Sequence, residues 1–177
     1  MNFVPRALRI EYEGAWHHVM NRGGAHQEIF KTDRQRELFL SLINEASNRF
    51  EIELHSYCLM DNHYHLLIHT PKCQLDKAMK LINGLYTQEF NYLEKRDGPL
   101  LRGRYKSLLI EDDSYLLQLS RYIHLNPIEA FLCTKPENYS WSSYKYYVGS
   151  EPTPPWLHTH ILLGMLDTMS YKDFCGV

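Results

Sequence analysis

Two short segments of this chain carry residues whose types and spacing suit metal-assisted chemistry. The first contains His63 and His65, and the second contains Tyr122 four residues before Asn126. Neutral imidazole is the commonest metal ligand in proteins, and a tyrosine hydroxyl can act as a covalent nucleophile. On a strand, side chains two positions apart share a face at about 7 Å, so the two rings could converge on one ion. An isolated His-x-His pair would more simply indicate a half-buried strand, and it is the second segment that gives the pair a chemical meaning.

A helix is predicted for the segment that contains the tyrosine. Residues typical of a helix N-terminus precede it, at Asp112, Asp113 and Ser114. Four residues then recur at i, i+4, i+7 and i+11 and would share one helical face, namely Tyr115, Leu119, Tyr122 and Asn126. Pro127 is expected to end this helix and to leave Asn126 at its fraying end. Tyr115 is the alternative nucleophile on the same face.

The elements along the chain alternate in the order of a ferredoxin-like fold. Strands are predicted over residues 15–20, 51–59, 63–70 and 105–110, and helices over 33–50 and 75–93. This βαββαβ order predicts an α+β fold with a four-stranded antiparallel sheet and helices on one face. The first and third strands would be central. The predicted third helix could then close over the histidine face and bring Tyr122 to it.

We expect one domain over residues 1–130 and a C-terminal extension, residues 131–177, packed on it. The extension contains an aromatic-rich run at 139–147. These rings could stack on unpaired bases or attach the extension to the domain, and we favour attachment. A last short helix is expected near residues 157–166.

Composition narrows the class of protein. The net charge of −2 is not that of an overall basic nucleic-acid binder, so any such binding must use a local patch. The chain has no GxxxxGK loop, and nothing in it indicates ATP use. The four cysteines are widely spaced, the N-terminus lacks a signal-peptide core, and no apolar run is long enough for a membrane span. These features predict a cytoplasmic protein with reduced thiols and no membrane segment.

Two basic segments could supply the local patch. Residues 101–106 contain three cations around a glycine and a tyrosine, namely Arg102, Arg104 and Lys106. This pattern suits a phosphate backbone and a stacked base, although a strand edge protected by charge would look the same. Arg22 is followed by two glycines, which could bring a cation and backbone amides close to a phosphate.

The remaining histidines of interest are expected to play minor parts. His17 and His18 are expected to be solvated at a strand edge. His69 and His124 are expected to orient phosphate or to stay on the surface rather than to bind metal.

Together these segments resemble the single-tyrosine HUH transposases. His63-Tyr64-His65 is similar to the HUH signature, and residues 122–127, YIHLNP, are similar to the catalytic-helix motif. Residues 16–23, 103–106 and 141–144 are also similar to that family. The YIxxNP form resembles the REP-associated branch of the IS200-like transposases, and the resemblance covers residues 5 to 147.

The resemblance implies a metal-dependent endonuclease and strand transferase that acts on single-stranded DNA with a hairpin. It implies that His63, His65 and Asn126 hold Mg²⁺ or Mn²⁺, although the ligands alone would also accept Zn²⁺. Tyr122 would attack phosphorus to give a 5′-phosphotyrosine link and a free 3′-OH. The implied DNA contacts are Arg22, Arg102, Arg104 and Lys106. On oligomeric state, the resemblance to the REP-associated branch implies a monomer, whereas the resemblance to the wider family implies a homodimer whose subunits exchange helices.

Two other functions fit part of the pattern. The first is a domesticated module of the same fold that binds DNA or RNA without cutting it. The second is a zinc hydrolase with water as nucleophile, which needs a carboxylate base near the histidines, and Asp61 and Glu111 are the candidates.

Overall fold

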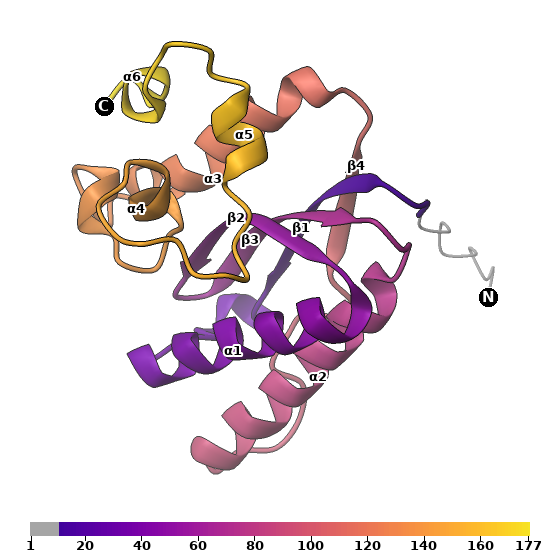
Figure 1. Ribbon diagram of the computed structural model, residues 1–177. Coiled ribbons are helices and arrows are strands. Elements are labelled where there is room, and N and C mark those ends of the chain that lie inside the picture. The colour runs from indigo at the N-terminus through magenta and orange to yellow at the C-terminus, as the bar shows by residue number, and fades with distance from the viewer. Residues whose placement is uncertain (1–10) are drawn as a thin grey trace, which may run out of the picture.

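The computed structural model describes residues 11–177 (Figure 1). Residues 1–10, where the sequence predicts no signal peptide and where the family resemblance begins, lie outside this described part. None of the helices within residues 11–177 is long and apolar enough to cross a membrane.

A four-stranded antiparallel sheet forms the centre of the fold. Its strands are β1 (Ala15–Arg22), β2 (Glu53–Met60), β3 (His63–Thr70) and β4 (Lys106–Ile110), in the spatial order β2-β3-β1-β4. Strands β3 and β1 are therefore central, as the sequence predicts. Side chains alternate along β3, so Tyr64 and Leu66 are buried on one face of the sheet and Leu67 is buried on the other.

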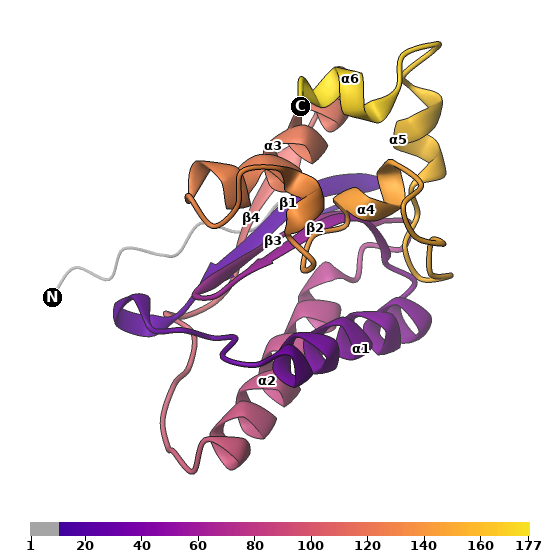
Figure 2. The ribbon, with the colours of Figure 1, turned by 90° about the vertical axis from the view of Figure 1, so that its left-hand side faces the viewer.

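Two long helices cover one face of the sheet (Figures 1 and 2). They are α1 (Asp33–Phe50) and α2 (Leu75–Leu93). Helix α1 begins with a capping box, in which Thr32 and Gln35 exchange side-chain-to-backbone hydrogen bonds. This arrangement confirms the ferredoxin-like α+β fold.

The opposite face is covered by α3 (Leu116–Glu129) and the C-terminal extension (Figure 2). The extension contains α4 (Tyr144–Tyr147), α5 (His160–Gly164) and α6 (Tyr171–Cys175). Short 3-10 turns span Gly24–His26, Asp113–Tyr115 and Pro136–Asn138. A second apolar cluster forms here, in which Leu67 of β3 packs with Leu119 and Ile123 of α3.

The extension runs along the outer edge of β2. Three backbone hydrogen bonds join the two segments: Leu59 N–H to Trp141 O, Ser143 N–H to Tyr57 O, and His158 N–H to Leu54 O, at 2.9, 3.0 and 2.9 Å. The aromatic rings of Tyr144 and Tyr147 are buried in the second cluster. The aromatic run therefore attaches the extension, as predicted, and the division into units at residue 130 stays a prediction.

Helix α3 does not end at Pro127, contrary to our expectation. It continues to Glu129, because only the Ile123 carbonyl loses a helical partner to the missing proline N–H. The Ala130 N–H still donates to the Asn126 carbonyl at 2.9 Å. Asn126 consequently lies within the helix rather than at a fraying end.

The end of β1 also differs from the prediction. The sequence predicts a strand that ends at residue 20, but Asn21 and Arg22 continue it, and Arg22 is paired with His63 of β3. Because β1 is central and covered on both faces, His17 and His18 are buried, with 1% and 5% of their surface exposed. The expectation that they are solvated at a strand edge is wrong.

Candidate active site

Two imidazoles of β3 lie side by side on the sheet face that α3 covers. The ring centroids of His63 and His65 are 5.1 Å apart, with nearly perpendicular planes. Nδ1 of His63 lies 2.6 Å from Oδ1 of Asn62, which orients the ring and leaves Nε2 for a metal ion. Burial lowers the pKa of His63, and burial together with the neighbouring His18 and His63 lowers the pKa of His65 to about 3. Both rings are therefore neutral at neutral pH, as metal ligands must be.

A third histidine completes this group. Nε2 of His18 lies 2.9 Å from Nδ1 of His65, and the two rings are stacked. Burial lowers the pKa of His18 to about 4, so this contact joins two neutral rings. Sequence reasoning missed His18, although its spacing from Trp16 and Met20 already put it on one face of a strand. That His18 lies beside His65 becomes clear only when β1 is known to pair with β3.

Tyr122 of α3 lies over these histidines. Its ring is edge-on to His65 at 5.7 Å and to His18 at 6.0 Å between centroids. Tyr122 remains 42% exposed, so it is not packed into the interior of the protein. Nδ2 of the buried Asn126 donates to the Tyr122 carbonyl at 2.8 Å. This bond holds the amide one turn below the tyrosine and uses only its nitrogen, so Oδ1 is left as a ligand atom.

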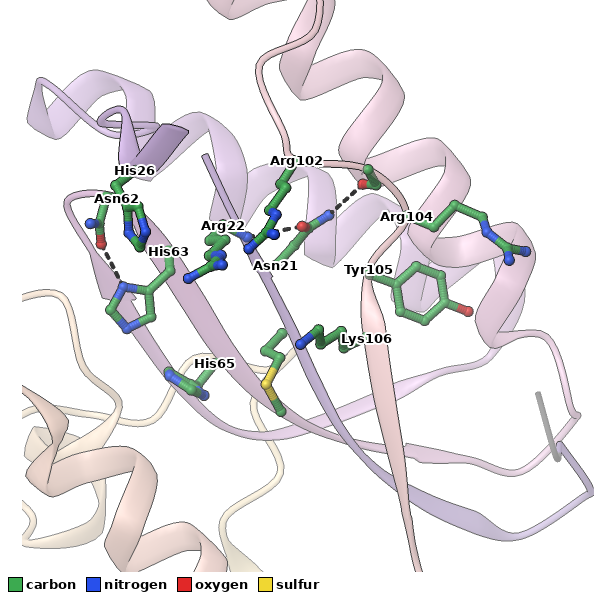
Figure 3. Close-up of a pocket in the computed structure, with 12 residues that line it drawn as sticks. Asn21, Arg22, His26, Asn62, His63, His65, Arg102, Arg104, Tyr105 and Lys106 are labelled. Atoms are coloured by element: carbon green, nitrogen blue, oxygen red, sulfur yellow. Dashed lines mark hydrogen bonds between the residues drawn. The ribbon is translucent and has the colours of Figure 1, made fainter. Parts of the chain in front are cut away.

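A basic cleft opens beside the imidazoles (Figure 3). It has a volume of about 810 Å³, and its lining includes His63 and His65 together with the four predicted DNA contacts, Arg22, Arg102, Arg104 and Lys106. The Arg102 N–H donates to the Arg22 carbonyl at 2.9 Å, which holds the two basic segments together. In Figure 3, Arg22, Arg102 and Lys106 lie near the histidines, whereas Arg104 extends away toward α2.

Comparison with known proteins identifies the family. Residues 11–126 match the family model described as "Transposase IS200 like". The chain belongs to the IS200-like transposase family. A search of curated protein sequences found no match.

Two solved structures are similar to this IS200-like transposase. A REP-associated tyrosine transposase bound to a REP hairpin is 13% identical, with a TM-score of 0.69, and the match covers 88% of this chain and 92% of that one. This likeness confirms the fold. A proposed transposase from Deinococcus radiodurans R1 is 18% identical, with a TM-score of 0.44, and the match covers 70% of this chain and 95% of that one.

Other residues considered from the sequence lie elsewhere in the transposase. His124 is fully buried and bonded to Tyr171 and Ser143, at 2.7 and 2.6 Å, so the expectation that it orients phosphate or lies on the surface is wrong. Asp61, a candidate base for water, is paired with Arg36.

One cleft residue was missed altogether. His26, in the turn that follows β1, lines the cleft, and in Figure 3 it lies beside Asn62 and His63. The sequence contains no motif that marks it.

Proposed function

We propose that this IS200-like transposase cuts and rejoins single-stranded DNA through a covalent link to Tyr122. The observation that carries the proposal is the exposed Tyr122 ring lying edge-on to His65 and His18. A phenol nucleophile, a pair of neutral imidazoles and a basic cleft are the parts that such a reaction requires.

The metal site would consist of His63, His65 and Asn126. The observation that supports the fit is that both imidazoles are neutral, with Nδ1 engaged and Nε2 free of hydrogen bonds from the described residues. Two nitrogens and an amide oxygen suit Mn²⁺ or Mg²⁺ in a site that leaves positions open. When bound, the ion would polarise the phosphoryl oxygens of the substrate.

The chemical step is a transesterification. The Tyr122 oxygen attacks phosphorus, a tyrosine O–P bond forms, and the bond from phosphorus to the 3′ oxygen breaks. The phenol loses its proton and the departing 3′ oxygen gains one, which leaves a 5′-phosphotyrosine and a free 3′-OH. Because an ester is exchanged for an ester, the 3′-OH can rejoin a strand without ATP.

We further propose a folded single strand with a hairpin as the substrate. The similar REP-associated transposase is bound to a REP hairpin, and its fold extends over most of this chain. Here Arg22, Arg102 and Lys106 would contact the backbone that leads to the histidines. Tyr122 and His65 of one chain already lie together, which supports a site complete within a monomer. Action in the cytoplasm is consistent with the four free cysteines.

The deciding experiment is covalent capture. The full chain is incubated with a labelled stem-loop oligonucleotide and Mn²⁺, and tyrosine peptides are analysed by mass spectrometry. We expect a nucleotide adduct on Tyr122, no adduct in Tyr122→Phe, and unchanged DNA binding in that variant. Tyr115→Phe, on the same helix face, is the matched control and should retain the adduct. An adduct that survives in Tyr122→Phe would refute the assignment, and binding without any adduct would identify a module that no longer cuts.

A further inference from the structure

The histidine face of the sheet carries a second group of ligand-type residues, at the opposite end of β3 from His63. His69 lies four residues beyond His65, which is about 13 Å along a strand. It is paired with Glu53 of β2. The pairing of β2 is irregular between Leu54 and Ser56, and the residue between them, His55, has its ring centroid 6.2 Å from that of His69.

Three side-chain atoms of this group lie close enough to share one ion. Nδ1 of His69 is 2.7 Å from Oε2 of Glu53, and Nε2 of His55 is 3.6 Å from the same oxygen. The ligand atoms of all three residues lie within 4.8 Å of one another. Ligands of a tetrahedral zinc ion, at about 2.0–2.1 Å from the metal, lie about 3.4 Å apart, so small shifts would complete such a site.

The buried ring of His55 lacks the hydrogen bonds that a buried imidazole normally makes. It is fully buried, and neither of its ring nitrogens has a hydrogen-bond partner in the described part of the chain. Buried polar atoms are nearly always paired, so an orphaned imidazole beside a carboxylate calls for an explanation.

The surroundings resemble those of a structural metal site rather than an open catalytic one. The Trp16 ring packs against His55 and His69, at 4.3 and 4.7 Å between centroids, and His55 is fully buried while His69 is partly exposed. His158 of the extension lies 5.7 Å from His55 between centroids. The hydrogen bond from its N–H to the Leu54 carbonyl fixes its backbone beside β2.

We propose that Glu53, His55 and His69 bind a structural divalent metal ion such as Zn²⁺, with His158 as the fourth ligand. Imidazole and carboxylate groups are both zinc ligands, and a set of three imidazoles and one carboxylate would leave no position open for a substrate. The ion would join β2 and β3 to the C-terminal extension. This site is separate from the proposed cleavage site and does not depend on it.

Zinc titration of the full chain tests the proposal. To remove the cleavage site, the titration uses the His63→Ala/His65→Ala variant, and bound Zn²⁺ is measured by calorimetry and by competition with a chromophoric chelator. We expect one Zn²⁺ per chain and a higher melting temperature in its presence. Adding Glu53→Gln should weaken binding by more than the roughly 10–100-fold typical of losing an outer-shell partner. Glu51→Gln, an exposed neighbour just before β2, is the matched control and should bind as the parent does.

Two outcomes would overturn the proposal. One is a His63→Ala/His65→Ala variant that folds, by circular dichroism, but binds no Zn²⁺. The other is unchanged affinity in both Glu53→Gln and His69→Gln, which would mean that Glu53 and His69 form only an ion pair. His158→Ala should weaken binding without abolishing it, and unchanged affinity would refute its role as fourth ligand. An anomalous-scattering peak between Glu53 and His69 in zinc-soaked crystals would locate the ion directly.

Discussion

Nε2 of His18 lies 2.9 Å from Nδ1 of His65, and this contact joins the two central strands next to Tyr122. If His65 offers Nε2 to a metal ion, its Nδ1 carries the proton and donates it to His18. His18 would then orient His65 and raise its basicity, as outer-shell partners of metal-binding histidines do.

We expect His18→Ala to raise the Mn²⁺ concentration needed for half-maximal cleavage by about 10–100-fold, because His65 loses its orienting partner. Stem-loop cleavage measured over a Mn²⁺ titration checks this. His160→Ala, an exposed histidine of α5, serves as the control. An unchanged Mn²⁺ dependence in His18→Ala would show that the contact has no part in metal binding.

Two substitutions of Asn126 distinguish a role as metal ligand from a purely structural role. Asn126→Ala removes Oδ1 and should weaken Mn²⁺ binding and cleavage together, whereas Asn126→Asp keeps an oxygen ligand and should retain part of both. Free Mn²⁺, followed by electron paramagnetic resonance, gives the affinity. If Asn126→Ala cleaves poorly but binds Mn²⁺ as the wild type does, its bond to the Tyr122 carbonyl is what matters.

The basic cleft predicts a measurable salt dependence. Replacing Arg102 or Lys106 by Ala should weaken binding of the single strand and reduce the slope of log K against log salt by about 0.7 for each phosphate that is no longer neutralised. Fluorescence anisotropy at several salt concentrations provides the slope. Arg34→Ala, an exposed cation on α1, should leave the slope unchanged. Equal effects of all three substitutions would argue for non-specific attraction only.

Buried His124 makes stability depend on pH. Burial lowers its pKa from 6.5 to about 3, so below pH 6.5 the unfolded chain binds a proton that the folded chain excludes. The stability present above pH 6.5 is therefore lost as the pH falls toward 3, by up to about 1.4 kcal/mol per pH unit for this one group. Urea unfolding at pH 7 and pH 5 measures the decrease, and His124→Asn should reduce the slope. Equal free energies of unfolding at the two pH values would contradict the prediction.

A buried hydroxyl network links the extension to the sheet. The Ser120 hydroxyl of α3 lies 2.8 Å from that of Ser56 in β2 and 2.7 Å from that of Tyr171 in α6. Ser120→Ala leaves both partners short of a bond and should lower the free energy of unfolding by about 1–3 kcal/mol. Ser41→Ala, whose hydroxyl is exposed, should cost much less. Urea unfolding of the two variants measures both free energies, and equal losses would contradict the prediction.

The local parts of the fold were predictable because their signals are local. The capping box at Thr32, the alternation along β3 and the apolar spacing of α2 each depend on a few neighbouring residues. The strand order followed from the βαββαβ pattern. From that strand order, the proximity of Tyr122 to His63 and His65 could be predicted.

The missed residues depend on pairing between distant segments. His18 joins the site because β1 lies beside β3, and His55 approaches His69 because the pairing of β2 with β3 is irregular there. His124 is buried because residues near Tyr171 fold back over α3. No spacing in the sequence specifies these contacts.

The hydrogen bonds from the extension to Leu54, Tyr57 and Leu59 occupy the polar groups on the outer side of β2. That margin of the sheet is consequently closed to a strand from another molecule, which removes one route to aggregation by edge-to-edge growth. The opposite margin is β4, a strand of five residues that begins with Lys106. Shortness and charge both discourage intermolecular pairing there, so both margins of the sheet are protected against edge-to-edge association.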